Sequence, residues 1–361
     1  MGRRVCAVAV AACLGILGMP SEAASPAAEL AERGHWKRLK AVIEPRAAAN
    51  PNDAEAQWLL SRVRLAYRDA DGALAPAEKA VALDARNAEY RWQLAQVVGE
   101  QASIASVFKQ MGLAKRFKRE AEAVLALDPK HTGAMVGLME FYYRAPGIVG
   151  GDKKKAAAIP NQIMAINKID GYIARIRLMG RMDPQPPAAE FEKVWVEAVQ
   201  ADSSRIEPHL NLASIYASGA TPRWDLAEKE ALIAKKIDPD RTGPYSILAA
   251  AYAARDRWPE LDAIVAEAEK MIPDNLTPYL RAGVTLTVTG KDLPRAERYV
   301  KKYLSQEPEP TAAQPAFARW RLGLVYEKQG RKAEALAEMQ AAVRLDPKFE
   351  QAQTDLKRLR R

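Results

Sequence analysis

The stretch that decides the fold is Ala316–Phe349, which reads AFARWRLGLVYEKQGRKAEALAEMQAAVRLDPKF. It is an alanine-rich amphipathic stretch that ends in an acidic residue and a proline. Gly323 and Ala335 are small, which lets two helices cross closely, and Tyr326 fills the space between them. Pro347 cannot continue a helix and sets the turn into the next one. The stretch therefore predicts a pair of packed helices.

The closing phrase of this stretch recurs along the chain. It ends at Pro129, Pro239 and Pro347, with weaker copies at Pro51, Pro273 and Pro308, and with Ala85 in place of the proline in one copy. The intervals 51–85, 239–273 and 273–308 are 34, 34 and 35 residues long, whereas 85–129 and 308–347 are 44 and 39. A period of 34 residues with occasional insertions is typical of a helix–turn–helix repeat.

The stretch resembles the tetratricopeptide repeat position by position. Leu322, Gly323, Tyr326, Ala335, Ala342 and Pro347 fall at consensus places 7, 8, 11, 20, 27 and 32. The resemblance implies an all-α, right-handed helical solenoid of about eight helix–turn–helix repeats over residues 26–349, with a polar capping helix at residues 350–361. Because one helix pair cannot bury its apolar face alone, the repeats should stack into one elongated body. The insertion around Pro146–Gly151 resembles one found in exported bacterial proteins of this family.

The first residues have the pattern of an export signal. Arg3 and Arg4 precede an apolar run, Val5–Met19, of 15 residues, which is short for a membrane span of roughly 20 residues. Small residues then predict cleavage after Ala23, so that residues 1–23 are a signal peptide. A lipoprotein-type cut before Cys13 is the alternative, but it would leave an unexplained apolar stub. We therefore expect an exported chain, periplasmic or secreted, without a lipid on Cys13.

The composition and the net charge limit the kind of protein that this can be and the kind of partner that it can bind. The 361 residues are 48% hydrophobic and 27% charged, as in ordinary globular proteins. The mean hydropathy of −0.28 excludes a polytopic membrane protein, and we expect no transmembrane segment in the mature chain. Removal of the signal takes away two arginines and one glutamate, so the net charge falls from +9 to +8. For an exported chain this charge indicates an anionic lipid surface, an anionic polymer or an acidic protein surface rather than nucleic acid.

The sequence offers little catalytic chemistry. The two cysteines lie in the signal peptide, the three histidines are widely separated, and no nucleophile elbow, HExxH or CxxC motif follows Ala23. We therefore expect no enzyme, no cofactor and no metal site. Gly147–Lys153 has glycines before a lysine but lacks the order of a phosphate loop, so we interpret it as a turn capped by Asp152. An anion or partner site at this insertion is the weaker alternative.

In the resembled family, the first helix of each repeat lines a concave groove, with consensus places 2, 5, 9 and 12 pointing into it. Three tryptophans fall at place 5, and arginines and amides fall at or beside the groove. Tryptophan and arginine dominate binding hot spots because they combine large apolar area with several donors. The predicted partner-binding residues are Trp58, Arg62, Trp92, Gln96, Asn211, Arg281, Trp320 and Arg321. The alternative is that the tryptophans are core.

The residues that form the family's clamp for chaperone C-termini are missing here. We therefore predict a scaffold that holds an extended peptide or a partner helix in the concave groove, within a cell-envelope assembly. The alternative function is a binder of an anionic envelope polymer or lipid surface through the basic face.

Overall fold

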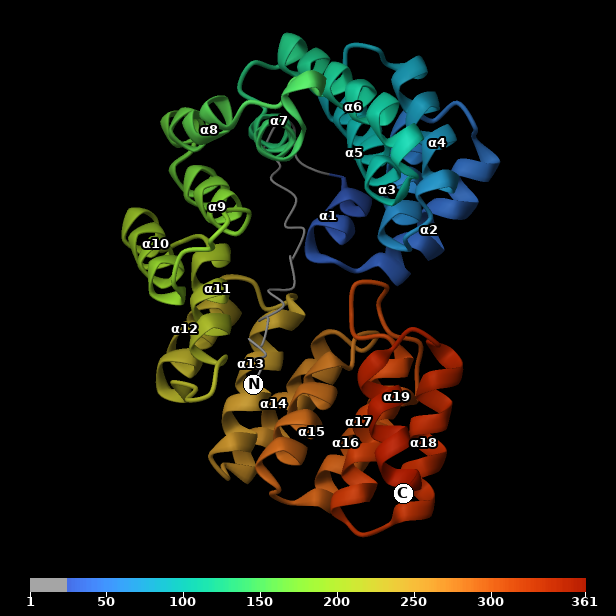
Figure 1. Cartoon of the computed structure of the whole chain (residues 1–361), viewed down its shortest axis with the longest axis vertical. Helices are drawn as coiled ribbons and strands as arrows, with labels where there is room; N and C mark the ends of the chain where they lie inside the picture. The colour runs from blue at the N-terminus through green and yellow to red at the C-terminus, as the bar shows by residue number, and fades with distance from the viewer. Residues whose placement is uncertain (1–24) are drawn as a thin grey trace.

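The computed structural model describes residues 25–361; the predicted signal peptide, residues 1–23, and Cys13 lie outside this range. The described part is all-α, without a β-strand, and a short 3₁₀ turn at Gly147–Val149 is its one other regular element. Figure 1 shows the helices stacked side by side along a strongly curved path. None of the described helices is long and apolar enough to cross a membrane.

The helices pair along the chain as the repeat predicts. The pairs are α1 (Pro26–Arg33) with α2 (Trp36–Ala49), α3 (Ala54–Ala66) with α4 (Ala70–Leu83), α5 (Ala88–Ile104) with α6 (Val107–Leu127), α7 (Thr132–Arg144) with α8 (Lys153–Ile166), α9 (Lys168–Met179) with α10 (Ala188–Ala201), α11 (Ile206–Tyr216) with α12 (Trp224–Ile237), α13 (Thr242–Ala254) with α14 (Trp258–Met271), α15 (Thr277–Thr289) with α16 (Leu293–Leu304), and α17 (Pro315–Lys328) with α18 (Lys332–Leu345). Helix α19 (Glu350–Arg360) caps the stack, as expected. The least regular repeat in the sequence, residues 171–204, is nevertheless a true pair, α9 with α10.

The small residues of the repeat lie at the close contacts between helices, as the sequence predicts. Ala335 and Ala342 are fully buried, and a Cβ atom at Gly323 would lie 2.8 Å from Cγ of Met339 on the partner helix. The extra length of the 85–129 interval, 44 residues instead of 34, lies in α5 and α6 themselves, which have 17 and 21 residues. At the other insertion, the carboxylate of Asp152 accepts hydrogen bonds from the first amides of α8, so this segment is the capped turn that the sequence predicts.

The curvature follows from unequal packing of the two helices in each unit. The first helices of successive units contact one another at α3–α5, α7–α9, α11–α13, α13–α15 and α15–α17. The second helices mainly contact the helices next to them in sequence. Because the first helices approach more closely, they form the inner layer of the curve, and their free faces line its concave side.

An arginine, a tyrosine and a glutamate repeat at the joints of the C-terminal half. The arginine at the N-cap of the second helix stacks on the tyrosine that ends the first helix, and it pairs with a glutamate of an earlier unit. The sets are Arg223 with Tyr216 and Glu192, Arg257 with Tyr252 and Glu228, and Arg331 with Tyr326 and Glu297. Arginine suits this position because its planar guanidinium stacks and forms ion pairs at once.

The stack bends so far that its beginning meets its later part. The backbone amide of Lys37 donates to Oε2 of Glu309 over 3.1 Å, and Arg38 pairs with Asp274 at 2.5 Å. Figure 1 shows the loop before α17 reaching toward the blue N-terminal helices. The sequence predicts an elongated solenoid; the structure is instead closed into a ring, because a small rotation per unit accumulates over nine units.

Candidate partner-binding surface

All eight predicted partner-binding residues lie on the first helices of their units: α3, α5, α11, α15 and α17. The structure therefore puts each of them on the inner layer, but it gives them different environments. Only the group on α15 and α17 combines exposed aromatic surface with free charge.

On α3, Trp58 is half-buried and Arg62 is already engaged. The guanidinium carbon of Arg62 lies 5.0 Å from the centre of the Trp58 ring, the neighbour relationship that their spacing predicts. Arg62 is 4% exposed, however, and its Nη2 pairs with Oε1 of Glu32 on α1 at 2.9 Å. Arg62 thus ties α1 to α3, and its charge is not available to a ligand.

On α5, the structure corrects the placement of Trp92 in the open groove. The ring is 8% exposed and packs edge-on against Phe117 and His131. It fits there because α7 offers glycines: a Cβ atom at Gly137 would lie 2.6 Å from Cη2 of Trp92. Trp92 is therefore core between two units. The signal that could have revealed this is the pair of glycines, four residues apart, in the following unit.

The predicted partner-binding residues include two with side-chain amides, Gln96 and Asn211, and both are half-buried. Gln96 is half-buried on α5, one turn after Trp92. Asn211 is half-buried on α11, and its side-chain amide donates to the backbone oxygen of Glu207 in the same helix at 2.8 Å. Each leaves some polar surface toward the concave side, but neither is joined to a charged or aromatic partner.

On α17, Trp320 is half-buried and is held by contacts with α19 and neighbouring rings. Its Nε1 donates to Oδ2 of Asp355 on α19 at 2.9 Å, and its ring packs against Phe317 and Phe349, with ring centres 5.6 and 5.3 Å away. The guanidinium of Arg321 lies 4.4 Å from the centre of the Trp320 ring. Sequence reasoning missed Phe317, although it occupies consensus place 2, one of the places that face the groove.

Arg321 and Arg281 are neighbouring cations, and the charge of Asp355 acts on Arg321 without forming an ion pair with it. Among residues 25–361, neither guanidinium forms an ion pair, and the buried Nε of Arg321 makes no hydrogen bond. Burial lowers the pKa of Arg321, and the charge of Arg281 lowers it further. The Arg281 side chain reaches water, yet the surrounding helices desolvate its guanidinium enough to lower its pKa as well. Such a pair gains more than an ordinary surface arginine from an approaching anion.

A hollow of about 410 Å³ adjoins this pair. Its lining residues are Thr287, Val288, Arg321, Leu324, Glu327 and Lys328. Val288 is 66% exposed and presents apolar surface in the lining of this hollow. We name the surface made by Arg281, Val288, Phe317, Trp320 and Arg321 the α15–α17 surface.

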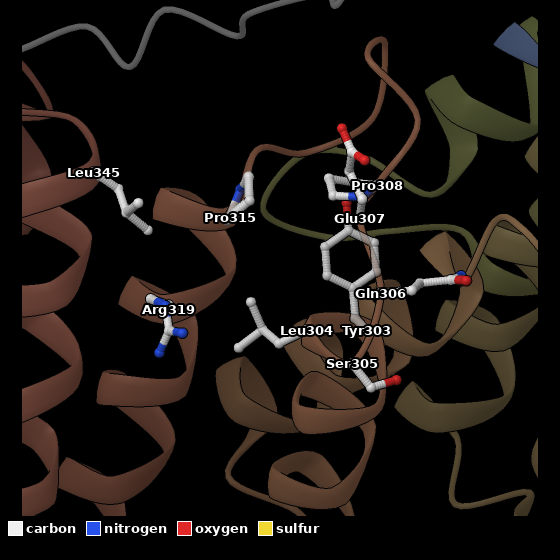
Figure 2. Close-up of a pocket in the computed structure, with 9 residues that line it drawn as sticks. All are labelled: Tyr303, Leu304, Ser305, Gln306, Glu307, Pro308, Pro315, Arg319 and Leu345. Carbon is white, nitrogen blue, oxygen red and sulfur yellow. The ribbon is translucent and has the colours of Figure 1, made fainter. Parts of the chain in front are cut away.

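A second hollow, of about 480 Å³, lies at the start of the loop that follows α16 (Figure 2). Its lining residues are Tyr303, Leu304, Ser305, Gln306, Glu307, Pro308, Pro315, Arg319 and Leu345. Arg319 already pairs with Glu338 at 2.9 Å, and the Tyr303 hydroxyl donates to the backbone oxygen of Ala313. Because its main polar groups are satisfied within the protein, this hollow is a weaker candidate than the α15–α17 surface.

Residues 318–349 match the family model of the tetratricopeptide repeat. Together with nine stacked helix pairs, this match defines the class: the chain is a tetratricopeptide-repeat protein, an all-α solenoid of the kind that serves as a protein-interaction scaffold. No curated protein sequence matches the chain significantly.

Three solved structures are similar in shape. Yeast Tom70 is 15% identical with a TM-score of 0.48, over 92% of this chain and 79% of that one. The human IFIT1 dimer with m7Gppp-AAAA is 16% identical with a TM-score of 0.47, over 91% and 86%. A tetratricopeptide repeat protein from Parabacteroides merdae is 13% identical with a TM-score of 0.42, over 85% and 99%. At these identities and scores, the likenesses say nothing about what the present chain binds.

Proposed function

We propose that the chain is an exported, non-enzymatic scaffold that holds an acidic peptide or partner helix on the α15–α17 surface, within a cell-envelope assembly. The observation that carries the proposal is the pair of neighbouring arginines, Arg281 and Arg321, neither of which forms an ion pair with another described residue. A carboxylate of the partner would supply the missing charge through bidentate hydrogen bonds. Trp320 and Val288 would contribute aromatic and apolar area beside it.

The chemistry of the surface defines the partner more closely. A guanidinium stacked on an aromatic ring keeps its edge free for donation while its face is occupied. The recognised segment should therefore present a carboxylate, from a side chain or a C-terminus, next to an apolar side chain that fits against Val288. Both groups must be accessible at once, which an extended peptide or the exposed face of a helix allows.

Capture from an envelope extract, followed by mass spectrometry, tests this proposal. The bait is the chain from Ala24 onward, compared with an Arg281→Ala/Arg321→Ala double variant. The matched control is Arg298→Ala/Arg344→Ala, which removes two exposed arginines from the second helices α16 and α18. A true partner is retained by the control and lost by the double variant. For a purified partner peptide, loss of a hot spot should weaken binding by about thirtyfold, equivalent to about 2 kcal/mol.

The alternative function, binding of an anionic polymer or lipid surface, is supported by the +9 formal charge of the full chain. Binding of this kind weakens steeply with salt, since it depends on many weak charge contacts. Dextran sulfate is a suitable probe, measured at low and at physiological ionic strength. Equal losses of affinity in the double variant and in the control would favour this alternative over the α15–α17 surface.

The export part of the proposal has its own test. N-terminal sequencing of the protein recovered outside the cytoplasm should begin at Ala24. A sequence that begins at Met1 would contradict export through a cleaved signal, and a lipidated N-terminus at Cys13 would contradict the cleavage site. Mass spectrometry of the same sample checks for a lipid.

A further inference from the structure

Where the ring closes, three side chains with metal-ligating atoms meet from distant parts of the chain. His35 precedes α2, Asp274 lies in the turn between α14 and α15, and Glu309 lies in the loop between α16 and α17. One potential ligand atom of each lies within 4.8 Å of the others. His35 and Glu309 are both 1% exposed. The three residues are named the closure cluster below.

Each carboxylate of the closure cluster has one oxygen that accepts a hydrogen bond and one oxygen that has no hydrogen-bond partner. Oδ1 of Asp274 accepts from Nη2 of Arg38 at 2.5 Å, and Oε2 of Glu309 accepts from the backbone amide of Lys37 at 3.1 Å. The other two oxygens, Oδ2 of Asp274 and Oε1 of Glu309, are buried without a hydrogen-bond partner. Folded proteins rarely leave such groups unpaired, because each one loses its hydration without compensation. Two unpaired carboxylate oxygens beside an imidazole nitrogen form a donor set that suits a cation.

A comparison with His131 shows what is unusual about His35. Both are buried N-cap residues, and both place Nε2 near a carboxylate, at 3.2 Å from Asp240 for His35 and at 3.3 Å from Glu89 for His131. The Nδ1 atom of His131 accepts a hydrogen bond from the amide of Ala134 at 3.0 Å. In His35, both ring nitrogens are buried without a hydrogen-bond partner, and the side chain caps nothing. The ring of His35 therefore has a nitrogen that is available to bind a ligand.

The electrostatics agree with this geometry. Burial, with a smaller contribution from the charge of Asp274, raises the pKa of Glu309 to about 7. A bound cation would relieve the burial penalty and the repulsion between the two carboxylates together.

We propose that His35, Asp274 and Glu309 bind one divalent transition-metal ion, with Zn²⁺ as the best fit. An imidazole nitrogen with two carboxylate oxygens suits Zn²⁺ and its neighbours, whereas Ca²⁺ and Mg²⁺ prefer oxygen ligands alone. The carboxylate of Asp240 beside Nε2 is the outer partner that metal-ligating histidines commonly have. Water would complete the coordination. This site departs from the expectation of no metal, which rested on the wide separation of the histidines in sequence.

The ion would act as a staple across the ring. His35 belongs to the first unit, whereas Asp274 and Glu309 flank the eighth, so their joint ligation ties the beginning of the curve to its later part. A ligand that binds the closed form alone stabilises it by mass action. The proposal does not depend on the identity of the groove partner.

Calorimetric titration of the metal-free chain with Zn²⁺ tests the site, with Co²⁺ as a spectroscopic probe. Wild type should bind one equivalent of Zn²⁺, and the Co²⁺ form should show visible absorption bands. Glu309→Gln nearly preserves shape, and it should weaken binding at least about tenfold. His35→Ala should behave likewise, while the matched control His131→Ala should keep the wild-type affinity. Circular dichroism of each variant confirms that it is folded.

Three results would overturn the proposal. One is no binding of Zn²⁺ by folded wild type, which would mean that the orphan oxygens share a proton instead of a metal. Another is an equal loss of affinity in His131→Ala. The third is tighter binding of Mg²⁺ or Ca²⁺ than of Zn²⁺, which the imidazole ligand does not allow.

Discussion

The backbone amide of Lys37 donates a hydrogen bond to Oε2 of Glu309, joining the start of α2 to a loop 272 residues further along the chain. The ammonium group of Lys37 donates to the backbone oxygen of Glu307 at 2.6 Å, and Arg38 pairs with Asp274. Together with the pairs that Arg33 and His35 form with Asp240, these contacts join the first unit to units far along the chain and hold the fold closed. The shape of the molecule therefore depends on a few polar side chains.

Reversal of one of these charges should open the ring. In Arg38→Glu, two carboxylates would face each other across the closure, so the radius of gyration measured by small-angle X-ray scattering should increase. Arg86→Glu, at an exposed position in the turn between α4 and α5, is the control and should leave it unchanged. Equal radii for wild type and Arg38→Glu would contradict the role of this ion pair.

The burial of Trp92 predicts a large loss of stability on truncation. Trp92→Ala should lower the free energy of unfolding by about 3–5 kcal/mol, because it leaves a cavity between α5 and α7. Trp58→Ala, at a half-buried position, should cost less. Urea unfolding followed by circular dichroism measures both, and similar values for the two variants would refute the core assignment of Trp92.

Gly137→Ala tests the same packing from the other side. Alanine favours a helix over glycine by about 1 kcal/mol, so the variant should be more stable if nothing opposed the new methyl group. Here the methyl carbon would lie 2.6 Å from the Trp92 ring and 3.0 Å from Phe117, so we expect a net loss of stability. A rise in the thermal midpoint would show that the ring can move away.

On the α15–α17 surface, Arg281 should strengthen binding of the partner while lowering the stability of the fold. Arg281→Gln removes one of two desolvated like charges, so the thermal midpoint should stay the same or rise, most clearly at low salt. Binding of the partner should fall in the same variant. A clear drop in the midpoint would show instead that Arg281 stabilises the fold.

The repeated stack of arginine on tyrosine should contribute modestly to stability. Arg257→Ala should cost about 1 kcal/mol, since the guanidinium is partly exposed and both stacks and pairs. Arg257→Lys keeps the charge but loses the planar stack, so it should recover only part of this loss. A double-mutant cycle with Glu228→Gln separates the ion pair from the stacking.

Asp170 provides a prediction about pH. Its pKa is raised, mainly by burial, although Thr132 donates a hydrogen bond to it at 2.9 Å. A carboxyl group whose folded pKa exceeds its unfolded value favours the fold below the unfolded pKa, and this contribution is lost as the pH rises through the folded pKa. Asp170→Asn keeps an acceptor for Thr132, so in denaturant titrations it should gain stability relative to wild type as the pH rises above the ordinary aspartate pKa of 3.8.

The sequence by itself determined the helix pairs and their stacking. The reason is local: small residues such as Gly323 and Ala335, a tyrosine between them and a closing proline act within one unit of 34 residues. The same reasoning correctly placed the eight candidate residues on the inner helices. It also correctly interpreted the turn before Asp152.

Tertiary structure alone decided which of those residues are free. Trp92 is buried because of glycines in the next unit, and Arg62 is paired because Glu32 lies in the preceding one, whereas Arg281 and Arg321 form no ion pair within residues 25–361. The ring closure and the cluster of His35, Asp274 and Glu309 depend on curvature summed over nearly the whole chain. Each unit adds only a small rotation, and no period in the sequence records the total; the sequence hints at the closing loop only through the long 308–347 interval.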